Sequence, residues 1–162
     1  MREIKTLKKA LLAGGAVLRH YFGRVAYELK GRANLLTEAD LNSQRTVIAV
    51  IKKAFPGHGF LAEEGPLPRT LAASEKVRGL WVIDPLDGTT NYAHTFPVAA
   101  VSIGFMAEGR VMAGGVFDPF RNELFLAERG GGAFMNGRRV KVSAAPKLAR
   151  SLLGTGLPYD RA

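Results

Sequence analysis

Cysteine is missing from this chain of 162 residues. The chain can therefore form no disulfide, no thiolate metal site and no cysteine nucleophile, so a bound metal would have to rest on carboxylates, histidines or carbonyl oxygens. Long apolar runs are missing too, and the first residues, Met1 to Lys5, lack the apolar stretch and the small-residue cleavage site of a signal peptide. We therefore expect a cytoplasmic protein that does not enter a membrane.

Acidic residues are few beside basic ones: 14 Asp and Glu stand against 23 Lys and Arg, which gives a net charge of +9. Such a charge can indicate a nucleic-acid partner. The basic residues, however, are scattered along the chain and form no long tract. We expect that nucleic acid is not the main partner, because a positive field would equally attract a small phosphate ester.

Two helices are predicted in the first part of the chain. In residues 1–23, apolar side chains recur at helical spacing with lysines on the opposite face, and Gly14-Gly15 weakens this helix. A second helix begins near Thr37, where Thr37 and Asp40 match a capping box, and ends at Pro56-Gly57.

After these helices the pattern changes to short apolar strands separated by turns. Asn136-Gly137 is a strong hairpin signal. The predicted strands cover residues 59–62, 80–83, 98–106, 111–117, 123–127, 133–135 and 139–142, and a short hairpin is expected over 25–37. An antiparallel meander after two helices predicts an α+β fold, with both helices packed on one face of an antiparallel sheet.

A pair of carboxylates follows one of these predicted strands. Asp84 and Asp87 are separated by Pro85-Leu86, and the proline fixes the backbone so that both side chains can turn toward one point. Two carboxylates upstream, Asp40 and Glu64, stand out with them. Carboxylate oxygens suit Mg²⁺, and two such ions about 3.5–4 Å apart can orient an attacking water and stabilise a leaving oxygen.

The residues that follow this pair favour an anion. Gly88 permits an unusual dihedral angle or a close backbone approach. Thr89 and Thr90 suit the start of a helix, where free N–H groups point outward. A plain turn is the alternative, because Asp-Pro and Asp-Gly are common turn pairs. The whole string, together with Glu63-Glu64 upstream, favours a cation site beside a phosphate site.

The string Asp84-Pro85-Leu86-Asp87-Gly88-Thr89-Thr90-Asn91 is similar to the first signature of the inositol monophosphatase family, which contains magnesium-dependent, lithium-sensitive sugar phosphatases. Four other segments resemble the same family: residues 35–40, 62–64 (with Ala62 where glycine is usual), 96–103 and 132–137. The resemblance covers nearly the whole chain. It implies the N-terminal half of an αβαβα layered sugar-phosphatase fold.

The resemblance also implies a set of Mg²⁺ ligands. Glu64 would bind the first ion and an additional one, Asp84 would bridge two ions, and Asp87 would hold the second. The Leu86 carbonyl would complete the first site. Glu63 is the alternative to Glu64, because neighbouring residues cannot be separated by physical arguments from the sequence.

Roles in catalysis and substrate binding follow from the same resemblance. Thr89 would activate the nucleophilic water with Asp40 as its hydrogen-bond partner, and Glu64 would act with them. The N–H groups of Gly88 and Thr89 would hold the phosphate, with Thr90 beside them. Two further residues would border the site: Lys30, near the metal-bound waters, and His94, at the mouth.

A second family signature, a Trp-Asp motif near the C-terminus, has no counterpart here, since the one tryptophan is Trp81. We therefore expect a truncated product or fragment with low or no activity by itself. Residues 1–147 would form the N-terminal metal- and phosphate-binding domain, and residues 148–162 would begin a truncated C-terminal domain with a strand over 151–155. The resemblance implies a homodimer for the complete protein.

Together, the residues and the resemblance predict a phosphomonoesterase that hydrolyses inositol monophosphate or a related sugar phosphate by attack of a metal-activated water. Fructose bisphosphate and phosphoadenosine phosphate are the alternative substrates. A non-catalytic metal- or RNA-binding fragment is the alternative from another functional class, and the net charge of +9 favours it.

Overall fold

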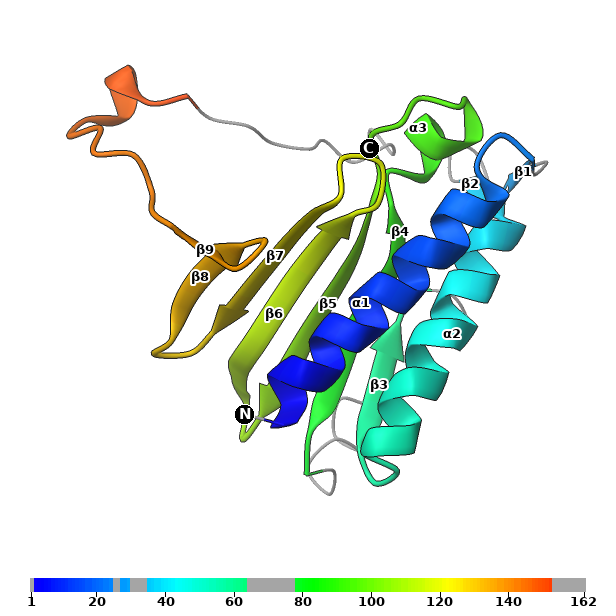
Figure 1. Cartoon of the computed structure of the whole chain (residues 1–162), viewed down its shortest axis with the longest axis horizontal. Helices are drawn as coiled ribbons and strands as arrows, with labels where there is room; N and C mark the ends of the chain where they lie inside the picture. The colour runs from blue at the N-terminus through cyan, green and yellow to red at the C-terminus, as the bar shows by residue number, and fades with distance from the viewer. Residues whose placement is uncertain (1, 25–26, 30–34, 64–77, 153–162) are drawn as a thin grey trace, which may run out of the picture.

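The computed structural model describes residues 2–24, 27–29, 35–63 and 78–152 (Figure 1). Within these ranges the chain forms two long helices and then a series of strands, in the order that the sequence predicts. The elements are α1 (Arg2–Tyr21), β1 (Tyr27–Leu29), β2 (Leu35–Thr37), α2 (Glu38–Ala54), β3 (Gly59–Ala62), β4 (Leu80–Asp87), α3 (Thr89–Ala93), β5 (Ala100–Ala107), β6 (Arg110–Asp118), β7 (Glu123–Glu128), β8 (Gly132–Met135), β9 (Arg138–Val140) and the 3₁₀ helix η2 (Leu148–Arg150).

Strands β3 to β9 form one seven-stranded sheet in chain order. The prediction of an α+β fold is confirmed, but the sheet is mixed, because β3 runs parallel to β4 while the later neighbours are antiparallel. The length of the connections explains the difference. Residues 63–79 separate β3 from β4, enough for the crossover that parallel strands need, whereas residues 108–109 join β5 to β6 as a tight hairpin.

Helices α1 and α2 lie side by side on one face of the sheet (Figure 1). The core between them and the sheet contains these fully buried large side chains: Leu7, Leu11, Leu18, Val47, Ile51, Trp81, Val101, Ile103 and Phe117. Gly14 and Gly15, expected to weaken α1, lie where the helix packs closely against α2 and the sheet. A Cβ atom at Gly14 would be 2.9 Å from Val47 Cγ2, and one at Gly15 would be 2.4 Å from Phe117 Cδ1.

Two predicted elements lie only partly within the described residues. Strands β1 and β2 pair antiparallel, as expected of the hairpin over 25–37, while its turn at 30–34 lies outside the described residues. Of the strand expected over 151–155, the described part, Ser151 and Leu152, is not in a strand. The helices in the described ranges are all too short or too polar to cross a bilayer.

Candidate metal and phosphate site

The carboxylate pair lies at the end of β4, where the strand leaves its regular pairing. Asp84 is opposite Ser102 and Asp87 is opposite Ala100, with a register shift between the two pairs. Pro85 lies in this irregular stretch, which suits a residue without a backbone N–H. The irregularity is fixed from the helix side, because Ser43 Oγ on α2 donates a hydrogen bond of 2.9 Å to the Pro85 carbonyl.

The backbone after Asp84 turns back toward the Asp84 side chain. The Leu86 N–H donates to Asp84 Oδ1 at 3.1 Å, which orients that carboxylate beside the Leu86 peptide. Gly88 then has a φ of 89°, in the left-handed region that favours glycine. A Cβ atom there would also lie 2.8 Å from the Val98 carbonyl oxygen. Both properties expected of this glycine are therefore present.

Helix α3 begins at Thr89, directly after this glycine. The Thr89 hydroxyl lies 2.9 Å from the Leu86 carbonyl oxygen and 3.3 Å from Asp40 Oδ1. A hydroxyl carries one proton, so it can donate to one of these acceptors at a time. Thr89 thus joins the β4 turn to the first turn of α2.

Asp40 is almost completely buried, with 1% of its surface exposed. Its Oδ2 accepts the Thr37 N–H at 2.8 Å, as expected from the capping box, and also accepts the Thr37 hydroxyl at 2.6 Å. Its Oδ1 is the atom that faces Thr89. The carboxylate therefore has one oxygen committed to the helix cap and the other turned toward the candidate site.

Negative charge is concentrated around Asp84. Burial, together with the nearby carboxylates of Glu63 and Asp87, raises the pKa of Asp84 from 3.8 to about 7. Glu63 also forms a side-chain hydrogen bond with Asp84, whereas the Leu86 N–H opposes the shift. A bound cation would stabilise the ionised form of these crowded carboxylates and so lower the pKa of Asp84.

We expect the metal-free chain to lose stability as the pH rises from about 4 to about 7. Asp84 has its higher pKa in the folded state, so folded Asp84 retains a proton that the unfolded chain has released. Unfolding then releases a proton, and a higher pH favours it. Urea unfolding at about pH 5 and about pH 8 with a chelator measures the effect. Asp84→Asn should flatten this dependence, and an unchanged slope would contradict the assignment.

The structure brings together most of the predicted residues that it describes. Glu63, Asp84 and Asp87 interact electrostatically, and Thr89 lies against Asp40. Two other candidates are described: Thr90 follows Thr89 in α3 and is half-buried, and His94 is exposed at the end of α3. Lys30 and Glu64 lie outside the described residues. Among the residues that the structure covers, no three His, Asp or Glu side chains converge closely enough to hold a metal.

Ser43 was not predicted from the sequence. It is completely buried, three residues after Asp40 on the inner face of α2. A serine on the apolar face of an amphipathic helix was the available signal, but its acceptor lies 42 residues away in the chain and could not be read from spacing.

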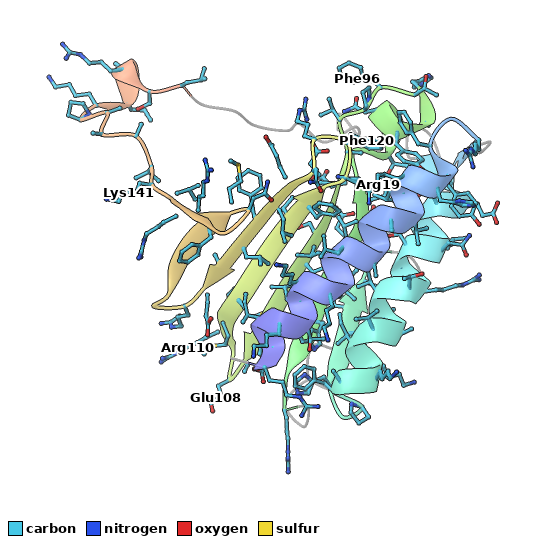
Figure 2. All side chains as sticks on the ribbon, in the orientation of Figure 1. Arg19, Phe96, Glu108, Arg110, Phe120 and Lys141 are labelled. Carbon is cyan, nitrogen blue, oxygen red and sulfur yellow. The ribbon has the colours of Figure 1, made fainter. Side chains whose placement is uncertain are left out.

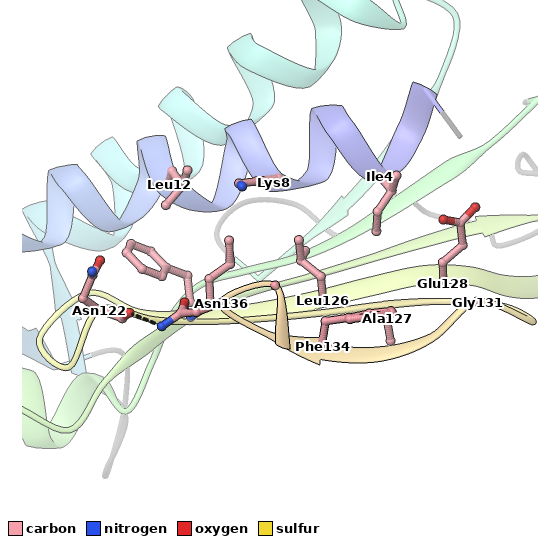
Figure 3. A pocket seen from close by; sticks show the side chains of 13 residues that line it. Ile4, Lys8, Leu12, Asn122, Leu126, Ala127, Glu128, Gly131, Phe134 and Asn136 are labelled. Carbon is pink, nitrogen blue, oxygen red and sulfur yellow. Dashed lines mark hydrogen bonds between the residues drawn. The ribbon is translucent and has the colours of Figure 1, made fainter. Parts of the chain in front are cut away.

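Two hollows differ in their suitability for this chemistry. A cavity of about 200 Å³ adjoins the site and is lined by Asp87, Gly88, Asn91, Asp118 and residues 98–100. A larger hollow of about 710 Å³ lies between α1 and strands β7 and β8, where Ile4 and Leu12 face Leu126 (Figure 3). The lining of this larger hollow is mainly apolar, and the smaller cavity is the one that lies against Asp87 and Gly88.

Comparisons with known proteins agree on one family. The sequence model of the Inositol monophosphatase family matches residues 2–162. An inositol-1-monophosphatase of Mesorhizobium japonicum is 38% identical over 159 residues, which are 96% of this chain and 58% of that relative. The Nus factor SuhB of Pseudomonas aeruginosa is 41% identical over 155 residues, 94% of this chain and 56% of that relative. A solved Thermotoga maritima IMPase has a TM-score of 0.80 and 36% identity, covering 90% of this chain and 55% of that one. The chain thus spans a little over half the length of these relatives.

Proposed function

Because this chain belongs to the inositol monophosphatase family, whose members depend on magnesium, we propose that it is the metal- and phosphate-binding part of a Mg²⁺-dependent phosphomonoesterase. Inositol monophosphate or a related sugar phosphate is the proposed substrate. The observation that carries the proposal is that the Asp84–Asp87 pair and the Thr89–Asp40 pair, from three different elements, lie at one place. Residues 1–147 are the proposed domain, with residues 148–162 beginning a second one.

The donor set fits a hard divalent cation. Asp84, Asp87 and the Leu86 carbonyl supply only oxygen ligands, which Mg²⁺ prefers. Glu64 is proposed as a further ligand, and Glu63 interacts with Asp84 in the same acidic group. When bound, Mg²⁺ supplies a polarised water and neutralises charge on the phosphate. The carboxylates crowded around Asp84 support the proposal, because a divalent cation would balance their negative charges.

Thr89 and Asp40 are suited to handle the proton of the attacking water. The Thr89 oxygen can accept a hydrogen bond from water while its own proton is donated to Asp40 Oδ1, 3.3 Å away. Asp40 Oδ2 is already occupied by the two donors of Thr37, so Oδ1 is the oxygen available to Thr89. As the water oxygen bonds to phosphorus, its proton passes to Thr89 while the Thr89 proton passes to Asp40 Oδ1. The bond from phosphorus to the sugar oxygen breaks, and the sugar oxygen takes a proton from solvent and leaves as an alcohol.

The phosphate itself is proposed to lie on the backbone turn before α3. The N–H groups of Gly88 and Thr89 would donate to it, with Thr90 beside them, because the sharp turn at Gly88 leaves the first amides of a helix without helical acceptors. Lys30 and His94 are proposed at the border of the site. A homodimer of the complete protein is likewise a proposal.

We expect the purified 162-residue chain to bind inorganic phosphate only when Mg²⁺ is present. Isothermal titration with phosphate, with Mg²⁺ and with a chelator, is the test, and phosphate binding that ignores Mg²⁺ would contradict the proposal. Phosphate release from inositol monophosphate, fructose bisphosphate and phosphoadenosine phosphate then ranks the substrates. Turnover by these 162 residues is expected to be low, and a rate in the ordinary enzyme range of about 1–1,000 per second would overturn that expectation.

A nucleic-acid-binding role is the second candidate, favoured by the net charge of +9. The segment after β7 also lacks acidic residues from position 129 to position 152 and carries these basic ones: Arg129, Arg138, Arg139, Lys141, Lys147 and Arg150. Binding to phosphates of RNA releases counterions, so the affinity would fall steeply with salt. An RNA-binding titration across salt concentrations, with and without Mg²⁺, separates this role from the phosphatase role.

A further inference from the structure

Tyr92 connects the candidate site to a distant helix. It lies three residues after Thr89 in α3, and only 1% of its surface is exposed. Its hydroxyl donates a hydrogen bond of 2.6 Å to the carbonyl oxygen of Leu18, 74 residues earlier in the chain. Its own N–H donates to the Gly88 carbonyl at 3.0 Å, so one residue is bonded both to the phosphate turn and to α1.

The acceptor lies in the last turn of α1. Helical N–H partners run out for the carbonyl groups at the end of a helix, although Leu18 lies early enough in this turn to keep one. The Leu18 carbonyl takes the Phe22 N–H at 3.1 Å and the Tyr92 hydroxyl at 2.6 Å. The carbonyl therefore stays satisfied if the tyrosine hydroxyl is removed, and the hydroxyl serves the position of α3 rather than the integrity of α1.

The Tyr92 ring is held by two phenylalanines. Its centroid lies 5.3 Å from that of Phe22, which follows α1, and 6.3 Å from that of Phe120, in the turn between β6 and β7. Phe22 and Phe120 are themselves 4.5 Å apart. Asp118 fixes this turn by accepting the Phe120 N–H at 2.8 Å. Figure 2 shows Phe120 beside the C-terminal end of α1 and next to α3.

The same end of α1 is bonded to the first turns of α2. Asn42 donates to the Tyr21 hydroxyl at 3.0 Å, and the Tyr21 hydroxyl lies 3.4 Å from Glu38 Oε1. Glu38 and Asn42 flank Asp40 in α2. Burial and the charge of Asp40 both raise the pKa of Tyr92, which places that carboxylate within electrostatic range of the tyrosine. The last turn of α1 is thus a common support for α2 and α3.

We propose that Tyr92 is a positioning residue that fixes α3 on the last turn of α1 and so holds Thr89 against Asp40. Its consequence for catalysis rests on the proposed function, because Thr89 and the turn before it are assigned to water activation and phosphate binding there. The two carboxylates proposed as metal ligands, Asp84 and Asp87, precede α3 on β4, and the hydrogen bonds of Tyr92 to Leu18 and Gly88 do not involve them.

The test is Tyr92→Phe in the full 162-residue chain, with Ile51→Val as the control. Tyr92→Phe removes one hydroxyl and leaves the ring packing, while Ile51→Val trims a completely buried side chain in the last turns of α2, away from Asp40. Hydrogen exchange is read at the amides of Tyr92, His94 and Thr95, whose acceptors lie within residues 88–92. Affinity for phosphate at saturating Mg²⁺ and affinity for Mg²⁺ alone are measured in parallel.

In Tyr92→Phe, exchange at these three amides should accelerate about tenfold, and phosphate affinity should fall by a similar factor while Mg²⁺ affinity stays within about twofold. Ile51→Val should lower stability without this local and selective pattern. Exchange that is unchanged, or accelerated evenly through the chain as in the control, overturns the positioning role, as does unchanged phosphate affinity. If the wild-type chain does not bind phosphate with Mg²⁺, the proposed function fails, and the exchange measurement alone decides whether Tyr92 fixes α3.

Discussion

In the complete protein, Asp87→Asn is expected to weaken Mg²⁺ binding at least tenfold and to lower Mg²⁺-dependent phosphate release by about a thousandfold. The substitution keeps the shape of the side chain and removes one negative charge. Asp87 is exposed at the end of β4, so folding should be nearly unaffected. The charge of Asp87 helps to raise the pKa of Asp84. A bound cation would offset the repulsion between these two carboxylates. Isothermal titration gives the Mg²⁺ affinity, and phosphate release gives the turnover.

Glu108→Gln is the matched control for this prediction. It removes the same charge from an exposed residue in the turn between β5 and β6, at the opposite end of the sheet from α3 (Figure 2). Mg²⁺ affinity should be unchanged in this variant. Equal losses in both variants would mean that net charge, not a specific ligand, controls binding. Full affinity and turnover in Asp87→Asn would remove Asp87 from the proposed mechanism.

The parts of the site that the sequence predicted are those encoded by neighbouring residues. The positive φ of Gly88 follows from an Asp-Gly step after a strand, and the cap formed by Thr37 and Asp40 follows from a spacing of three residues. The start of α3 at Thr89 belongs to the same class. Each of these features is decided within one turn of chain, where backbone sterics and local hydrogen bonds dominate.

The parts that were not predicted depend on contacts between distant segments. Ser43 reaches Pro85 across 42 residues and Tyr92 reaches Leu18 across 74, and no periodicity marks such pairs. The parallel pairing of β3 with β4 has the same origin, because direction depends on the path of the connection and not on the strand sequence. These contacts set the distance between Thr89 and Asp40. Most residues of the site could therefore be predicted from the sequence, but their arrangement in space could be seen only in the structure.

Gly15 shows how tertiary packing can reverse a local interpretation. Helix propensity alone predicts that a larger residue at Gly15 would stabilise α1 by up to about 1 kcal/mol. The position of the helix on the sheet predicts the opposite. A Cβ atom at Gly15 would lie 2.4 Å from Phe117 Cδ1 and 2.5 Å from Phe117 Cε1. Phe117 is 1% exposed and belongs to the hydrophobic core, so a shift of its ring would disturb the packing of its core neighbours.

We therefore expect Gly15→Val to destabilise the chain by about 3 kcal/mol, because overpacking exceeds the gain in propensity. Gly57→Val is the control, since a Cβ atom there meets nothing within 4 Å, and its effect should stay within about 0.5 kcal/mol. Urea unfolding of the metal-free chain measures both changes. A displaced α1 would also carry its last turn, with the Leu18 carbonyl that binds Tyr92, away from α3. Gly15→Val should consequently weaken phosphate binding more than Mg²⁺ binding, even at urea concentrations where the chain remains folded. An unchanged midpoint of unfolding would show that α1 does not rest on Phe117 as closely as the structure requires.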